Sequence, residues 1–203
     1  MMKIFYTVTS PIARKCRIIA RELSIMDRIE EIITTTRSKD ALIMQHNPNG
    51  MVPTLETDEG YKIVESMAIC NYLEKQSNNK NFIPQDKKTY WQIYALDSIA
   101  SQTFESIVSR AREKFYKPEE FHFPAGIKHE QGRAIRTLDF LEKESTSFKD
   151  TFSKLHVTIG LTCLVLDNVF PDEEWEKNRN NLVEIYEHFK KRDSFLETVN
   201  KNT

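Results

Sequence analysis

The stretch 47–66 constrains the fold of this 203-residue chain more than any other part of it. It opens with Asn-Pro and Asn-Gly pairs, which form turns because proline fixes φ and both asparagine and glycine tolerate positive φ. Pro53 precedes a short strand-forming run and cannot donate to a strand ladder. It therefore marks a strand start or carries a special peptide bond, and we hypothesise a cis Val52-Pro53 bond. Asp58-Glu59-Gly60 then separates two short apolar runs, which predicts a β-hairpin.

Glu65 and Ser66 follow the hairpin and open a segment, 67–73, with apolar residues at helical spacing. A helix N-terminus has unpaired N–H groups and partial positive charge, so it attracts a carboxylate. Ser66 adds a hydroxyl and Glu65 accepts from an ammonium group, so the pair suits an amino-acid-like group. A cis bond would also present the N–H and C=O of Val52 to an extended peptide ligand. The alternative is a plain capped helix with Ser66 as its N-cap.

Ser10 is the second point of possible chemistry. Residues 3–8 are β-prone, and apolar positions from Ile12 to Leu23 have helical spacing, which makes Ser10 the expected N-cap and Pro11 the first helical residue. A hydroxyl at this helix start points to the side of the sheet where the Val52-Pro53 turn lies. It would donate to a thiol sulfur and, with the helix dipole, favour thiolate over thiol. The alternative is that Ser10 only caps the helix.

The order of elements predicts an α+β protein. A strand over 28–34 completes a βαβ unit, and the hairpin and helix complete a βαβ–ββα, thioredoxin-like domain over 1–77. Residues 78–88 lose periodicity and carry turn residues, so we expect the linker there. Amphipathic patterns then predict an all-helical domain over 89–203, including a buried helix over 155–166.

Composition narrows the partners and the compartment. The net charge is −1, so nothing in it favours nucleic acid or an anionic membrane. The three cysteines are scattered and odd in number, which suits a reducing compartment, and the five histidines have no metal-binding spacing. No apolar run approaches the length of a membrane span. We expect a soluble cytoplasmic protein without a metal.

Two motifs resemble a known family. Val52-Pro53-Thr54-Leu55, followed by Glu65-Ser66-Met67-Ala68-Ile69, resembles the glutathione-binding half of the cytosolic glutathione S-transferases. Thr9–Lys15 resembles the serine-type start of bacterial members. The resemblance implies that Val52 and Pro53 pair with the cysteinyl backbone of glutathione, that Glu65 and Ser66 hold its γ-glutamyl end, and that Ser10 stabilises its thiolate.

The resemblance also implies further contacts, although the chain departs from the family in places. Met51 stands where a lysine is common, which leaves Lys39 as the candidate for the glycyl carboxylate. The electrophile would lie between the domains, against the first long helix. The residues predicted to contact it there are Ile99, Thr103 and Ile107. A homodimer is expected from the family alone.

A second departure concerns the buried helix. The family begins this helix with a capping box, Ser/Thr-x-x-Asp, whereas this chain has Ser153-Lys154-Leu155-His156. An imidazole replaces the carboxylate that would accept from the N-cap N–H, which puts this reciprocal hydrogen bond in question.

The predicted function is a glutathione S-transferase that conjugates the glutathione thiolate to a small electrophile, with glutathione as co-substrate and detoxification as its role. One alternative is a non-catalytic interaction protein of the same fold, as in the stringent-starvation regulators. Another is a glutathione-dependent isomerase or lyase. The first alternative predicts little affinity for glutathione, and the second predicts binding without turnover of generic aryl halides.

Overall fold

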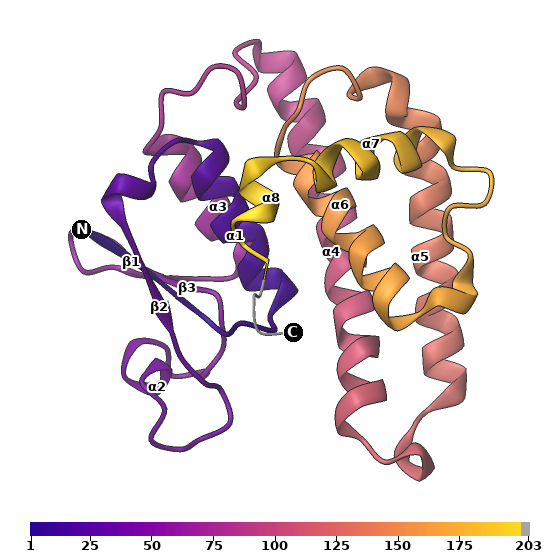
Figure 1. Cartoon of the computed structure of the whole chain (residues 1–203), viewed down its shortest axis with the longest axis horizontal. Coiled ribbons are helices and arrows are strands. Elements are labelled where there is room, and N and C mark those ends of the chain that lie inside the picture. Colours follow the sequence, from indigo (N-terminus) through magenta and orange to yellow (C-terminus); the bar gives the residue numbers. More distant parts are fainter. Residues whose placement is uncertain (200–203) are drawn as a thin grey trace. The chain divides into compact units, whose positions relative to one another are not determined.

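The computed structural model describes residues 1–199, which form two compact units (Figure 1). The first unit is Met1–Ile83 together with the residues from Asp193 onward, and the second is Pro84–Arg192. The change of unit after Ile83 falls within the linker range 78–88. Residues 193–199, however, pack with the first unit, although the sequence was divided so that they belong to the helical domain.

The first unit is built on a four-stranded mixed sheet with the strand order β2-β1-β3-β4. β1 (Met2–Tyr6) pairs in parallel with β2 (Ile29–Ile33), and β3 (Thr54–Glu56) runs antiparallel to both β1 and β4 (Lys62–Val64). The order of strands and helices is the predicted βαβ–ββα arrangement, so the α+β fold class is confirmed.

Helices cover this sheet and close its core. α1 (Pro11–Glu22) and α3 (Ser66–Lys75) pack against each other, and the short α2 (Ile43–His46) packs against β3. Side chains from β1, α1, α2 and two loop positions meet in one buried cluster, because each turns its apolar side inward. That cluster comprises Phe5, Tyr6, Ala13, Ala41, Ile43 and Val52.

A C-terminal segment completes the first unit. α8 (Asp193–Leu196) packs against α1, and Ser194 Oγ donates to Glu22 at 2.5 Å. The Arg14 guanidinium donates to the Phe195 carbonyl at 2.9 Å and lies over the Phe195 ring. These contacts explain why this segment belongs to the first unit, while the helix before it belongs to the second.

The described part of the second unit is entirely helical. Its α-helices are α4 (Lys87–Tyr116), α5 (Pro124–Glu144), α6 (Lys154–Val169) and α7 (Asn180–Lys190). It also contains three short 3-10 helices, η2 (Glu119–Phe121), η3 (Ser145–Ser147) and η4 (Pro171–Glu173). One more 3-10 helix, η1 (Met26–Arg28), lies in the first unit. α6 lies between α4 and α7 and is buried nearly all round, as its apolar sequence predicts. α4 continues to Tyr116 and α5 starts at Pro124, so the connection between them is short.

The capping box of α6 is complete despite its histidine. The Ser153 N–H donates to Nδ1 of His156 at 3.2 Å, so the imidazole supplies the acceptor that a carboxylate would otherwise provide. Nδ1 must be unprotonated to accept this bond. Burial favours that state, because it lowers the pKa of His156 to about 4.

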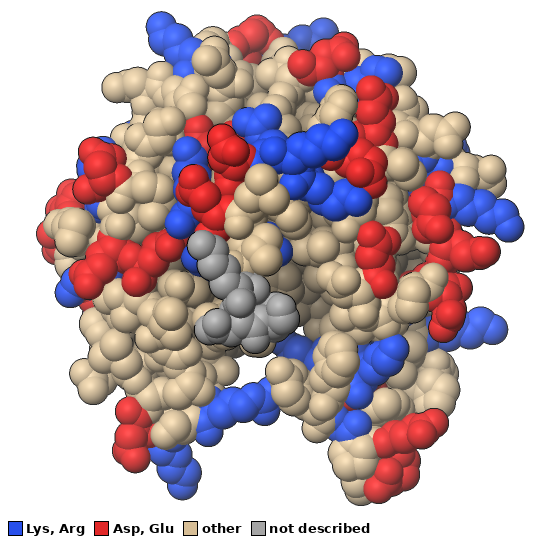
Figure 2. Space-filling model, viewed as in Figure 1, with Lys and Arg blue, Asp and Glu red and all other residues tan. Residues whose placement is uncertain are grey.

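The surface and the helices give two further observations. On the face drawn in Figure 2, acidic side chains lie beside basic ones, in keeping with the net charge of −1. Within residues 1–199, no helix combines the length and the apolar character that crossing a membrane requires.

Candidate functional site

Strand register brings three chain segments to one end of the sheet. Phe5 of β1 lies opposite Thr54 of β3, which in turn lies opposite Val64 of β4. The end of β1, the start of β3 and the end of β4 therefore lie side by side. The residues just beyond these positions include the N-terminus of α1, the Val52-Pro53 turn and the N-terminus of α3.

Ser10 is the N-cap of α1, at the first of these segments. Its Oγ accepts from the Ala13 N–H at 3.2 Å, and Pro11 occupies the first helical position. A hydroxyl has two acceptor lone pairs and one hydrogen to donate. The cap uses a lone pair, and no group among residues 1–199 accepts the hydroxyl hydrogen. Capping the helix and donating to a ligand are thus compatible roles for Ser10.

The Val52-Pro53 turn contains the hypothesised cis peptide bond. Within the described residues, neither the N–H nor the C=O of Val52 has a hydrogen-bond partner. Asn47 holds the turn from behind, because its buried Nδ2 donates to the Met51 carbonyl at 3.0 Å and to Thr54 Oγ1 at 3.1 Å. The Val52 backbone groups are therefore fixed in place and remain unpaired.

At the start of α3, the structure corrects the predicted cap. The N-cap is Glu65 and not Ser66, because the Glu65 carboxylate reaches the N–H groups of Met67 at 2.9 Å and Ala68 at 3.0 Å. Glu65 adopts a φ of 74°, which is uncommon for a residue with a side chain. Ser66 is the first helical residue and is only 3% exposed, and its Oγ lies 3.4 Å from the Glu65 carboxylate.

Lys39 is the residue predicted to meet the glycyl carboxylate, and His46 on α2 is a second basic side chain. Lys39 is exposed, and no acidic side chain among residues 1–199 pairs with it. His46, which is also in this region, stacks on Phe5 and donates from Nδ1 to Glu56 at 2.7 Å. This hydrogen bond holds the pKa of Glu56 below its ordinary value. Of the two side chains, Lys39 is the one without a partner.

Tyr6 provides a second hydroxyl, at the end of β1. It is buried beneath the Arg17 guanidinium, which lies 3.9 Å from its ring centre and is itself bound to Glu31. The Tyr6 ring is therefore part of the packing between β1 and α1.

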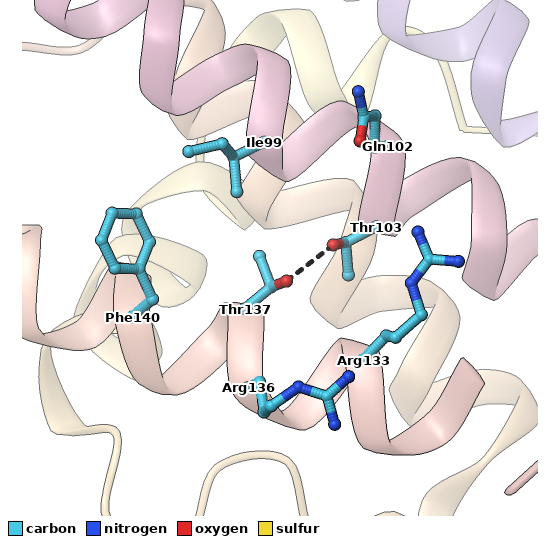
Figure 3. Close-up of a pocket in the computed structure, with 7 residues that line it drawn as sticks. All are labelled: Ile99, Gln102, Thr103, Arg133, Arg136, Thr137 and Phe140. Atoms are coloured by element: carbon cyan, nitrogen blue, oxygen red, sulfur yellow. Dashed lines mark hydrogen bonds between the residues drawn. The ribbon is translucent and has the colours of Figure 1, made fainter. Parts of the chain in front are cut away.

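The three residues predicted for the second-substrate pocket separate into two groups. Ile99 and Thr103 line an open groove of about 350 Å³ between α4 and α5, and Ile107 is buried in the core of the second unit (Figure 3). A ligand would not reach Ile107 in this structure. The Thr103 hydroxyl donates to Thr137 Oγ1 at 2.9 Å across the groove floor.

The groove has an apolar end and a cationic end. Ile99 and Phe140 lie toward one end, and Arg133 and Arg136 lie toward the other (Figure 3). Arg133 pairs with Glu130 at 3.0 Å, whereas no acidic side chain in the described residues pairs with Arg136. The groove can therefore accept a small molecule that has an apolar body and an anionic group.

Comparison with known proteins gives a consistent result. The family model described as glutathione S-transferase, N-terminal domain, matches residues 9–76, which span all three segments at the sheet end. An uncharacterized GST-like protein of Escherichia coli K12, YibF, is 28% identical over 97% of this chain and 98% of its own length.

Solved structures agree over the whole chain. A glutathione S-transferase of Methylobacillus flagellatus, solved with GSH bound, is 25% identical and superimposes with a TM-score of 0.86 over 98% of both chains. A glutathione transferase family member of Pseudomonas fluorescens, solved with bound glutathione, is 25% identical with a TM-score of 0.87, again over 98% of both chains. These matches support a member of the cytosolic glutathione S-transferase family. The first unit has the fold of that family's thioredoxin-like domain.

Two features of this chain were missed in the sequence. Asn47 was treated only as a turn former, although it is the residue that positions the Val52 turn. The only available signal was its place before a proline. The His46–Glu56 pair was also missed, because it joins α2 to β3 and nothing local in the sequence indicates that pairing.

No group of three or more potential metal ligands lies together within residues 1–199.

Proposed function

We propose that this chain is a glutathione transferase that conjugates glutathione to a small electrophile. The observation that carries the proposal is the meeting of three ligand-directed features at one end of the sheet. These are the Ser10 hydroxyl, whose hydrogen has no acceptor in the described residues, the unpaired N–H and C=O of Val52, and the α3 N-terminus at Glu65 and Ser66. The relatives that were solved with glutathione bound give independent support.

In the proposed pose, glutathione lies extended along this end of the sheet. The cysteinyl backbone pairs with the N–H and C=O of Val52, next to Pro53. The γ-glutamyl carboxylate meets the N-terminus of α3 and the Ser66 hydroxyl, and its ammonium group meets the Glu65 carboxylate. Three donors already approach that carboxylate, which has about four lone-pair sites and so accepts one more. Lys39 faces the glycyl carboxylate.

The proposed chemistry is a nucleophilic substitution or addition at carbon. Ser10 donates to the glutathione sulfur, and the positive end of the α1 dipole adds to this effect, so the thiol loses its proton to solvent more readily. The thiolate then attacks the electrophilic carbon, a C–S bond forms, and the leaving group departs with its electron pair. Serine-type activation by Ser10 is part of this proposal.

We place the electrophile against the face of α4 that bears Ile99 and Thr103. The apolar and cationic ends of that groove favour a substrate with an apolar body and an anionic group. We further propose that the protein works as a homodimer in the cytoplasm, where conjugation removes harmful electrophiles.

A non-catalytic interaction protein is the second candidate, and one observation favours it. The Glu65 carboxylate already caps α3, and Ser66 is almost fully buried, so both γ-glutamyl contacts are partly occupied by the fold itself. This candidate predicts that glutathione binds weakly or not at all. A glutathione-dependent isomerase or lyase would bind glutathione as the transferase does, without turning over aryl halides.

Calorimetry of glutathione binding tests the proposal. The double variant Glu65→Gln, Ser66→Ala should bind glutathione at least about tenfold more weakly than wild type, since it loses charge-assisted hydrogen bonds. Asp86→Asn is the matched control, because Asp86 caps α4 in the same way at the other unit and should leave binding unchanged. If the wild type shows no binding at millimolar glutathione, the transferase proposal is wrong and a protein partner should be sought.

A further inference from the structure

Two thiols lie side by side behind the predicted γ-glutamyl site. Cys16 is on α1 and Cys70 is on α3, and their sulfur atoms are 3.8 Å apart. Both side chains are buried, at 0% and 1% exposure. The third cysteine, Cys163 on α6, is equally buried but has no second thiol beside it in the described residues.

We propose that Cys16 and Cys70 are an oxidisable pair that forms a disulfide between α1 and α3 when the protein meets hydrogen peroxide. A disulfide requires a sulfur–sulfur distance of about 2.04 Å. The two sulfurs must therefore approach by about 1.8 Å, which side-chain rotation and a small shift of one helix supply.

The reaction balances with peroxide as the only added reagent. Peroxide oxidises the Cys70 thiol, which is the slightly more accessible of the two, to a sulfenic acid and is reduced to water. The Cys16 sulfur then attacks the Cys70 sulfur, the S–S bond forms and the S–O bond breaks. The hydroxide that leaves takes the Cys16 proton and becomes a second water. Two thiols are thus oxidised by one peroxide.

Burial sets the rate of this reaction and its selectivity. Burial raises the pKa of the Cys16 thiol, and the adjacent Cys70 raises it further, so little thiolate is present. The attack of the Cys16 sulfur on Cys70 is consequently slow, and a bulky disulfide reagent would not reach either sulfur, because both are buried. Burial likewise raises the pKa of Cys163, so proximity to a partner thiol, and not thiol acidity, distinguishes the pair.

The pair is connected to the candidate site through Ser66. The Cys16 thiol contacts the Ser66 carbonyl at 3.8 Å, and Cys70 lies one helical turn after Ser66 on the same helix. Disulfide formation removes this S–H donor and pulls on the first turn of α3. We therefore expect oxidation to weaken binding of the γ-glutamyl group about fivefold, as the loss of about one hydrogen bond would. This second step rests on the proposed function.

Mass spectrometry tests the disulfide directly. After treatment with excess peroxide and removal of the oxidant, the intact wild-type protein should lose the mass of two hydrogen atoms. A non-reduced digest should contain a peptide that links Cys16 to Cys70. Cys163→Ser should behave as wild type, and Cys70→Ser should not lose this mass. Absence of the linked peptide in the wild type, or its dependence on Cys163, would overturn the proposal.

Calorimetry with S-methylglutathione tests the connection to the site, because this ligand has no thiol and cannot reduce the disulfide. Peroxide-treated wild type should bind it about fivefold more weakly than reduced protein, and Cys70→Ser should bind it equally before and after treatment. Equal affinity of oxidised and reduced wild type would overturn the connection. If reduced protein does not bind the ligand, the proposed function fails, while the linked peptide still decides the disulfide.

Discussion

At the scale of single residues, Ser10 has an observed role as a helix cap and a proposed role as a donor to the thiolate, and a single substitution to alanine would remove both. Its oxygen caps α1, and its hydrogen is free to donate to a ligand. Ser10→Ala removes both, so we expect kcat/KM for an aryl halide to fall about a hundredfold, as when one donor to a developing anion is lost. The free energy of unfolding should fall by about 1 kcal/mol with the lost cap. Steady-state kinetics and urea denaturation measure the two effects.

Two further substitutions separate these roles of Ser10. Ser10→Thr keeps the cap and the hydroxyl, so both activity and stability should stay near wild type. Ser10→Asp keeps the cap and removes the donor, so it should be as stable as wild type while losing activity at least as strongly as Ser10→Ala. Full activity in Ser10→Asp would show that Ser10 is only a cap.

The site residues differ in how far the sequence could predict them. Ser10 and the α3 N-terminus follow from signals within three or four residues, because caps and helix starts are local structures. The exact cap of α3 was wrong by one residue, since Glu65 and Ser66 are both possible acceptors and only the positive φ of Glu65 decides between them. Asn47 and the Cys16–Cys70 pair depend on distant contacts that no local pattern contains.

At the scale of elements, the capping box of α6 makes stability depend on pH. The pKa of His156 is about 4 in the folded protein and about 6.5 in the unfolded chain, because burial disfavours the imidazolium. Between these values the unfolded state binds more protons, so the free energy of unfolding falls as pH decreases from about 6.5 to about 4. The full loss is about 3 kcal/mol.

Comparison of wild type with His156→Gln measures this contribution. The glutamine amide oxygen can accept the Ser153 N–H and does not titrate, so the variant should lose less stability in that pH range. Urea denaturation at several pH values between 7 and about 4.5 gives the two curves, and the difference between them cancels the other titrating groups. Parallel curves would contradict a neutral, buried His156.

The contact between α6 and α7 depends on one glycine. A Cβ atom at Gly160 would overlap the Phe189 ring, which is fully buried. Gly160→Ala should therefore lower the free energy of unfolding by about 2 kcal/mol through overpacking, although alanine favours a helix. Gly132→Ala on α5 is the matched control. There the Cβ meets only the flexible end of Arg136, so the substitution should raise stability by up to about 1 kcal/mol.

Thermal unfolding of these two glycine variants gives the comparison. A stabilising Gly160→Ala would mean that Phe189 moves aside at little cost, and that the α6–α7 packing is looser than the structure indicates.

At the scale of the whole molecule, the predictions from sequence were most complete for the fold. Hydrophobic periodicity and the turn residues gave the element order of both units, because each element must bury one face. They did not assign residues 193–199 to the first unit, since that depends on contacts of Arg14 and Glu22 with a segment far along the chain. The groove between α4 and α5 was missed for the same reason.

That groove carries a prediction about the second substrate. Arg136→Gln should raise the KM for an electrophile that bears a carboxylate, by about fivefold to tenfold, because it removes an unpaired cation. The KM for glutathione should not change. Arg112→Gln, an exposed arginine of α4 outside the groove, is the matched control. If both substitutions raise the KM for the electrophile equally, the effect is only one of long-range charge. If neither substitution changes this KM, the electrophile binds elsewhere.

The most direct test of the central claim is the pKa of the glutathione thiol in its complex with this protein. Ultraviolet absorbance of the thiolate, followed as pH is raised, gives that value. We predict that the thiol pKa is lowered toward neutral pH in wild type and in Ser10→Thr, and that it returns toward the value of free glutathione in Ser10→Ala. Glutathione that binds with an unchanged thiol pKa in wild type would contradict activation at this site.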